Sequence, residues 1–161
     1  TYFIFTSKDN KMIFVQPAYL PSVNYFKDFN DNDLVYNINL GLDESDYFDE
    51  TYMSNDNGVF KVKVPTTNKN KSNFQRDIKI DYNNNWINSH THSLQSAYGK
   101  FPYFIFYLDP ILNVLNTNHT FMIDLNYDLL SLFLELLNYD QKPVKNTLIG
   151  KCTFENFSMI S

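Results

Sequence analysis

The chain has 161 residues, of which 43% are hydrophobic and 17% aromatic, and this predicts one globular domain with its own core. The formal net charge of −5 argues against a broad nucleic-acid-binding surface. Cys152 is the single cysteine, which excludes an internal disulfide, and no apolar run reaches the roughly 20 residues of a membrane-spanning helix. No secretory signal pattern opens the chain. We therefore expect a cytoplasmic protein with no transmembrane segment and no nucleic-acid partner.

The first part of the chain alternates between apolar runs and turn residues. These runs predict strands near residues 2–5, 12–16 and 34–40, and a short helix over Val23–Phe29. Between them lies the loop Gln16–Pro21, in which Pro17 and Pro21 each fix φ and remove a backbone donor. A rigid loop between the carboxyl end of a strand and a helix is a common ligand site in α/β proteins, and a purely structural connection is the alternative.

Charge is strongly segregated in the next part. Every charged side chain from Asp28 to Gly58 is acidic, and nearly every one from Lys61 to Lys79 is basic. The pair Asn57-Gly58 predicts a tight turn before a strand over 59–64. We expect an acidic loop to lie beside a basic hairpin so that the two screen each other. A carboxylate cluster for a divalent cation is the alternative, although the spacing matches no EF-hand loop.

The second half is mainly helical after one more strand near 77–81. Trp86–Tyr98 predicts a helix because Ile87, His90 and Leu94 fall on one stripe. The aromatic segment Phe101–Tyr107 predicts another helix after Pro102.

Two capping patterns follow. Asp109-Pro110 has the form of an N-cap with proline at the first helical position, and it predicts a separate short helix to Leu115. Asn126 is the expected N-cap of a leucine-rich, buried helix over Tyr127–Leu137. Residues 145–154 predict an edge strand. Strands and helices thus alternate, and the expected fold class is α/β, a single domain with a mixed central sheet flanked by helices.

Two stretches resemble signatures of the WbqC-like protein family. The first contains Gln16-Pro17, Tyr19, Pro21 and Tyr25-Phe26. The second runs from Ile80 to Phe104, and it contains Asn85-Trp86, His90, Ser93-Leu94, Ala97-Tyr98 and Pro102-Tyr103-Phe104. The leucine-rich segment after Asn126 is similar to the C-terminal part of the family, so the resemblance runs from Met12 to about Gln141. On this basis we expect residues 1–161 to form a single WbqC-like domain.

The resemblance implies a transferase of surface-polysaccharide or O-antigen biosynthesis that moves a sugar or an acyl/aminoacyl group to a sugar. Its partner would be a small-molecule sugar or acyl donor. The family's Asn-Arg pair between the two signatures is missing, because residues 43–56 are acidic and contain no arginine. The alternative is therefore a non-catalytic WbqC-fold binding or assembly protein, encoded by a bacterium, a virus or a phage, that has lost the chemistry. The oligomeric state stays open.

The candidate catalytic residues are His90, Gln16 and Tyr98. His90 lies on the apolar stripe of its helix, where it is either a general base facing a cleft or a hydrogen-bonded core residue. Gln16 ends an apolar strand, so its amide either reads a substrate or fixes its own loop. The candidate substrate-binding residues share aromatic or proline rings that stack on sugars or fill a core: Pro17, Tyr19, Pro21, Tyr25, Trp86 and Tyr103.

No metal or cofactor is predicted. His90 and His92 are two residues apart, and on a helix they point in opposite directions. The four glycines are far apart, which excludes phosphate-binding and dinucleotide-binding glycine loops. Cys152 is expected to be a structural cysteine rather than a nucleophile.

Overall fold

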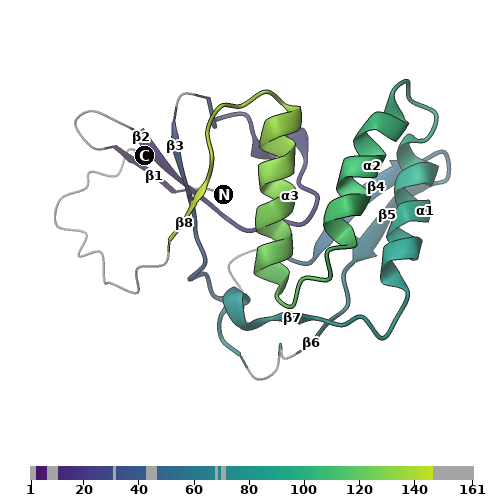
Figure 1. Cartoon of the computed structure of the whole chain (residues 1–161), viewed down its shortest axis with the longest axis horizontal. Helices are drawn as coiled ribbons and strands as arrows, with labels where there is room; N and C mark the ends of the chain where they lie inside the picture. The colour runs from purple at the N-terminus through teal and green to yellow at the C-terminus, as the bar shows by residue number, and fades with distance from the viewer. Residues whose placement is uncertain are drawn as a thin grey trace.

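The structure, a computed structural model, describes residues 3–6, 11–30, 32–42, 47–67, 69 and 72–146 (Figure 1). Its strands are β1 (Phe3–Thr6), β2 (Lys11–Val15), β3 (Asp33–Tyr36), β4 (Glu50–Asn55), β5 (Gly58–Lys63), β6 (Thr66–Thr67), β7 (Lys79–Ile80) and β8 (Val144–Lys145). Its helices are α1 (Trp86–Tyr98), α2 (Phe104–Leu115) and α3 (Met122–Leu136). The predicted mixed α/β class is confirmed.

The largest sheet has the strand order β1-β2-β3-β8 and is mixed. β1 runs antiparallel to β2, whereas β2, β3 and β8 run parallel to one another. Parallel neighbours cannot be joined by a tight hairpin, so the segment between β2 and β3 crosses from one end of the sheet to the other. The predicted helix over Val23–Phe29 is wrong: only a 3₁₀ turn, Val23–Tyr25, forms there. The buried rings of Phe26 and Phe29 pack edge to face 5.6 Å apart and fix the rest of the segment.

The remaining strands form two separate ribbons beside this sheet. β4 and β5 make an antiparallel hairpin, and β6 pairs with β7. The expected strands near 59–64 and 77–81 are therefore present, but they do not join the four-stranded sheet. Gly58 has φ +120°, a conformation that favours glycine, as the Asn57-Gly58 turn signal indicates. β4 lies where an acidic loop was expected, and it buries Thr51 and Met53 on alternate positions.

The charged side chains of this hairpin pair with one another, in agreement with the expected screening. Asp49 is 5% exposed, and its Oδ2 accepts bonds from the Nζ of Lys69 and from Thr66 Oγ1. Glu50 accepts a bond from Lys63 Nζ at 3.1 Å and holds Lys61 at 3.4 Å. Within the described residues no group of three His, Cys, Asp or Glu side chains could hold a metal ion. Residues 43–46 of the acidic stretch lie outside the described part.

Helix α1 begins and ends where the sequence predicts, but α2 does not. Phe104–Leu115 is one continuous helix with Pro110 inside it, so the predicted break at Asp109-Pro110 is wrong. Proline inside a helix leaves the carbonyl four residues earlier without its donor. That residue is Phe106, which is exposed, so water can solvate the freed carbonyl. The left-handed residue Tyr103, φ 64°, turns the chain from α1 into α2.

Helix α3 begins five residues before its predicted start. Phe121 forms an isolated antiparallel bridge with Lys79, and the Met122 backbone N–H donates to the Ile78 carbonyl oxygen at 2.9 Å. This pairing with the β7 segment satisfies a donor of the first helical turn. Asn126 is therefore a buried residue inside the helix rather than its N-cap, and its Nδ2 donates to the Phe48 carbonyl oxygen at 2.8 Å.

The core is formed by α3, the four-stranded sheet, the β4–β5 hairpin and the inward faces of α1 and α2. Tyr36 on β3 is fully buried, and its hydroxyl donates to the Ile123 carbonyl oxygen of α3 at 2.9 Å. Leu129 and Leu134 complete the face of α3 that is packed inward. In the described part of the chain, no helix combines the length and the apolar character required to cross a bilayer. The predicted strand over 145–154 overlaps β8 at Lys145, and residues from 147 onward lie outside the described residues.

Candidate functional site

The loop Gln16–Pro21 follows β2 and is held by its neighbours along its length. The Tyr25 hydroxyl donates to the Gln16 carbonyl oxygen. The Tyr19 backbone N–H donates to the Tyr47 carbonyl oxygen at 2.8 Å. Pro17 and Tyr19 are buried, so the loop is fixed by packing as well as by its prolines.

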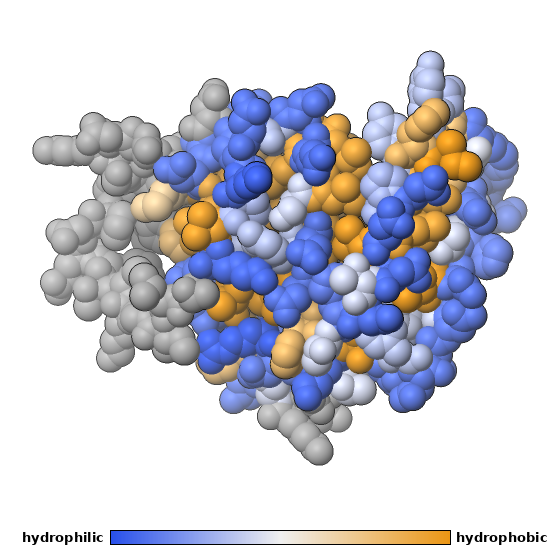
Figure 2. All heavy atoms as spheres, in the orientation of Figure 1, coloured by the Kyte–Doolittle hydropathy of each residue, from blue (hydrophilic) through white to orange (hydrophobic). Residues whose placement is uncertain are grey.

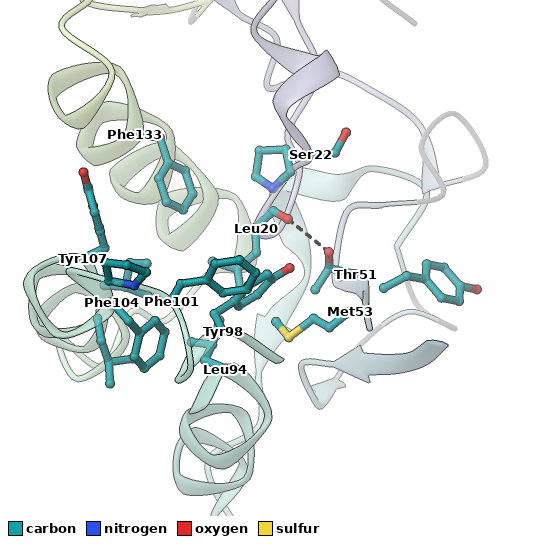
Figure 3. Close-up of a pocket in the computed structure, with 15 residues that line it drawn as sticks. Leu20, Ser22, Thr51, Met53, Leu94, Tyr98, Phe101, Phe104, Tyr107 and Phe133 are labelled. Atoms are coloured by element: carbon teal, nitrogen blue, oxygen red, sulfur yellow. Dashed lines mark hydrogen bonds between the residues drawn. The ribbon is translucent and has the colours of Figure 1, made fainter. Parts of the chain in front are cut away.

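The backbone of Leu20, within this loop, is strained. The φ angle of Leu20 is +43°, in the left-handed region that bulky residues rarely adopt. Pro21 follows directly, and a proline restricts the backbone of the residue before it to extended conformations. Such a conformation costs about 1–3 kcal/mol, and it persists only where surrounding contacts impose it. Thr51 Oγ1 supplies one such contact by donating to the Leu20 carbonyl oxygen at 3.0 Å (Figure 3). Strain of this kind is common at ligand sites.

Tyr19 and His90 meet inside the protein. The Tyr19 hydroxyl and His90 Nδ1 are 2.7 Å apart, and His90 Nε2 lies 3.2 Å from the Lys63 carbonyl oxygen. A carbonyl oxygen only accepts, so Nε2 carries the proton, and Nδ1 accepts from the Tyr19 hydroxyl. The Trp86 ring packs edge to face on the imidazole, 4.9 Å between centroids. Both ring nitrogens of His90 are therefore engaged within the protein.

Burial keeps both partners of this pair neutral. His90 is 4% exposed, and burial lowers its pKa from 6.5 to about 4, against the opposing effect of its hydrogen bond to the Lys63 carbonyl. Burial raises the pKa of the Tyr19 hydroxyl well above 10. At neutral pH the imidazole is thus an uncharged link between the proline loop, α1 and the end of β5. Its predicted role as a general base stays a prediction.

A cavity of about 430 Å³ opens beside the strained loop (Figure 3). Its walls come from the proline loop, β4, α1, α2 and one residue of α3. Its lining residues are mainly apolar or aromatic: Leu20, Pro21, Ser22, Thr51, Tyr52, Met53, Leu94, Tyr98, Phe101, Pro102, Phe104, Tyr107, Leu108, Ile111 and Phe133. A cavity of this volume fits one small organic ligand.

Two of the predicted site residues, Pro21 and Tyr98, line this cavity. The Tyr98 hydroxyl has no hydrogen-bond partner among the described residues, so it is available to a ligand. Tyr103 is 71% exposed and lies outside the cavity wall. The others also lie off the cavity wall, in the protein behind it or beside it: Gln16, Pro17, Tyr19, Tyr25, Trp86 and His90.

The stripe of α1 explains why His90 and Tyr98 are separated. His90, Leu94 and Tyr98 are four residues apart, so they lie one above another on the same helix face. Eight residues of α-helix span about 12 Å. Leu94 and Tyr98 line the cavity, whereas His90, one turn before Leu94, does not. The sequence thus predicts the shared face correctly, and only the packing shows which of its residues reaches the cavity.

Several cavity residues were not predicted from the sequence. Thr51 and Met53 belong to β4, which lies in the stretch expected to be an acidic loop. Leu108 and Ile111 are three residues apart on the buried side of α2, a spacing that indicates an inward helix face but does not say what that face meets. Phe133 reaches the cavity only because α3 packs beside α2. No sequence signal predicts that contact.

The cavity chemistry favours an uncharged or weakly polar part of a ligand, such as a sugar ring or an acyl chain. Its wall contains no acidic, basic, histidine or cysteine side chain. Tyrosine hydroxyls and the Ser22 hydroxyl are its main side-chain polar groups, and Thr51 uses its own hydroxyl to hold Leu20. Aromatic rings with hydroxyl tips suit the faces and hydroxyls of sugars and also the carbon chain of an acyl group. This donor set has no ligands for a metal ion.

The comparisons with known proteins gave one match. The model of the WbqC-like protein family matches residues 16–156. No curated protein and no solved structure is significantly similar to the chain. The match spans both signature stretches, the cavity and helix α3. The chain belongs to the WbqC-like protein family.

Proposed function

We propose that this chain is a transferase of surface-polysaccharide biosynthesis that moves a sugar, or an acyl or aminoacyl group, to a sugar, and that its substrate lies in the aromatic cavity. One observation carries the proposal: the two family signatures meet at the cavity wall. Pro21 and the strained Leu20 come from the first signature, and Tyr98, Pro102 and Phe104 come from the second. A wall built from both signatures is what a shared substrate site requires.

The residues of the two signatures take different roles in this proposal. Tyr98 contacts the substrate, because its hydroxyl borders the cavity. His90 and Tyr19 act as positioning residues: their hydrogen bond joins α1 to the proline loop, and both of these elements contribute to the wall. Gln16 acts through the same loop, at the point where the Tyr25 hydroxyl binds its carbonyl.

A second candidate function is a binding or assembly protein that keeps the cavity without performing a reaction. The cavity wall offers no acid or base other than tyrosine, and both nitrogens of His90 are engaged away from it. General acid–base catalysis normally depends on a titratable group within hydrogen-bond reach of the substrate. This function predicts a bound ligand that is recovered unchanged.

The test begins with the melting temperature of the chain in the presence of nucleotide sugars, acyl-CoAs and aminoacyl donors. A ligand that binds only the folded chain raises this temperature by mass action. Ser22→Trp fills the cavity mouth from an exposed position and should abolish the shift. Val23→Trp makes the same change on the next residue, which does not line the cavity, and should retain it.

Tyr98→Phe then tests the predicted substrate contact, with Tyr103→Phe as the matched control outside the cavity. Loss of a hydrogen bond to the ligand should weaken binding by about five- to tenfold in the first variant only. Incubation of the binding donor with an acceptor sugar separates transfer from binding alone. If no ligand class shifts the melting temperature, or if Ser22→Trp binds like the wild type, the cavity is not the site.

A further inference from the structure

The residues that line the cavity include two groups that differ in burial. We call the buried group the floor, and none of its members is more than 9% exposed: Thr51, Met53, Leu94, Leu108 and Ile111. We call the exposed group the mouth: Ser22, Tyr52, Tyr98, Phe101, Pro102 and Tyr107. Figure 2 shows hydrophobic side chains at the surface over α2, the helix that contributes to both groups. The cavity therefore has an aliphatic inner end and an aromatic, hydroxyl-bearing outer end.

The side chains of the floor offer almost no polar atom to a ligand. The only hydroxyl among them belongs to Thr51, and this hydroxyl donates its proton to the Leu20 carbonyl oxygen at 3.0 Å. The other floor side chains are aliphatic or, in Met53, a thioether. A ligand group that reaches the floor cannot replace the hydrogen bonds it made to water, so a polar group is disfavoured there.

This chemistry separates the three groups that the proposed transferase could move. A sugar carries hydroxyls around its ring, and the floor side chains have no free donor for their oxygens. An aminoacyl group carries an ammonium charge, and the cavity wall contains no acidic side chain to pair with it. A plain acyl chain has no polar atom beyond its carbonyl group. It therefore gains free energy on leaving water and loses no hydrogen bond.

We propose that the floor binds the aliphatic chain of an acyl donor and that Met53 sets the longest chain that fits. This inference rests on the proposed function, because it chooses among the substrates of that function. The carbonyl end of the donor lies at the mouth, where the Tyr98 hydroxyl donates to the carbonyl oxygen. In the transfer, the bond between the acyl carbon and its carrier breaks and a bond from that carbon to a sugar oxygen forms. The proton of the sugar hydroxyl leaves with the carrier.

Met53 is the floor residue placed to limit the length of the chain. Its side chain extends from β4 toward Leu94 and Tyr98 of α1 (Figure 3), so it occupies the space between these two elements. Met53→Ala removes the thioether end of the side chain and deepens the floor. Met122→Ala is the matched control, because Met122 is fully buried but does not line the cavity.

The experiment measures dissociation constants by calorimetry for the full chain and a series of uncharged N-acetylcysteamine thioesters with butyryl, hexanoyl, octanoyl and decanoyl chains. In the wild type we expect affinity to rise by about tenfold for every two methylene groups until the chain reaches Met53, and then to level off. The glycyl thioester should bind more weakly than the butyryl thioester. Met53→Ala should move the levelling-off point to longer chains, and Met122→Ala should leave it unchanged.

A milder pair of variants covers the case in which either alanine variant fails to fold. Ile111→Val shortens a floor side chain by one carbon, and Ile123→Val makes the same change at a buried residue outside the cavity wall. Changes of this size are usually tolerated in a core. Ile111→Val should bind a chain one carbon beyond the wild-type limit about fourfold more tightly than the wild type does, and Ile123→Val should not.

Three results would overturn the inference: equal affinity for all chain lengths in the wild type, tighter binding of the glycyl than of the butyryl thioester, or the same length limit in the floor variants as in their controls. The nucleotide sugars tested with Ser22→Trp separate this inference from the proposed function. If a nucleotide sugar binds in the cavity and no thioester does, the acyl inference alone is wrong. If neither class binds, the cavity function is wrong as well.

Discussion

The hydroxyl of Tyr19 and Nδ1 of His90 lie 2.7 Å apart although the two residues are 71 positions apart in the chain. This hydrogen bond joins the rigid proline loop to the middle of α1. Both segments also contribute to the cavity wall, the loop through Pro21 and α1 through Tyr98. The geometry of the cavity therefore depends on a buried contact between two residues that do not line it.

Tyr19→Phe should destabilise the protein by about 1–3 kcal/mol, because the variant leaves Nδ1 of His90 buried without a donor. Urea denaturation measures the change in the free energy of unfolding. Tyr82→Phe is the matched control, since the Tyr82 hydroxyl donates to the His119 carbonyl at an exposed position, and we expect a loss below about 0.5 kcal/mol there. Equal losses in the two variants would show that the buried pair has no special role.

The stability of the protein should fall as the pH drops from about 6.5 to about 4. Over this range the unfolded chain binds a proton at His90 while the folded chain does not, because burial lowers the folded pKa to about 4. The unfolded state then binds more protons, so the free energy of unfolding decreases on acidification, by about 3 kcal/mol at most for this group.

His90→Gln isolates this contribution from those of other groups. The variant keeps the other two histidines, so its pH dependence serves as the baseline for the wild type. The difference in unfolding free energy between wild type and variant should shrink steadily between pH 6.5 and pH 4. A difference that stays constant with pH would mean that the folded pKa of His90 is not lowered.

Thr51→Val should loosen the strained part of the proline loop. The change keeps the shape of the side chain but removes the hydrogen bond to the Leu20 carbonyl oxygen, at a cost of about 1 kcal/mol. Amide hydrogen exchange at Tyr19, whose N–H binds the Tyr47 carbonyl, should speed up. Thr67→Val, on the exposed end of β6, is the control and should leave that exchange rate unchanged.

Asn126→Ala should cost about 2 kcal/mol, because the Asn126 side chain is fully buried and holds the Phe48 carbonyl. Asn85→Ala makes the same change at the start of α1, where the Asn85 side chain forms no capping hydrogen bond, and should be nearly neutral. Thermal or urea unfolding of both variants checks this contrast. If Asn85→Ala lost more stability than Asn126→Ala, the side-chain amide at the start of α1 would matter more for folding than the buried one.

Local patterns determined a substantial part of this structure. The stripe of α1, the stiffness of the loop Gln16–Pro21 and the turn at Gly58 all depend on neighbouring residues, and each lies where the sequence predicts it. The mixed α/β class and the family signatures were also readable from the chain. Even the shared face of His90 and Tyr98 follows from helical spacing alone.

The tertiary structure decided the features that depend on distant contacts. The bridge between Phe121 and Lys79 moves the start of α3 ahead of Asn126, and solvent at Phe106 permits Pro110 inside α2. Burial by the proline loop and Trp86 makes His90 a neutral link, whereas Tyr98, two turns away on the same face, borders the cavity. Local propensity fixes which way a side chain points on its own element, but only packing between elements fixes whether it meets solvent, a cavity or the core.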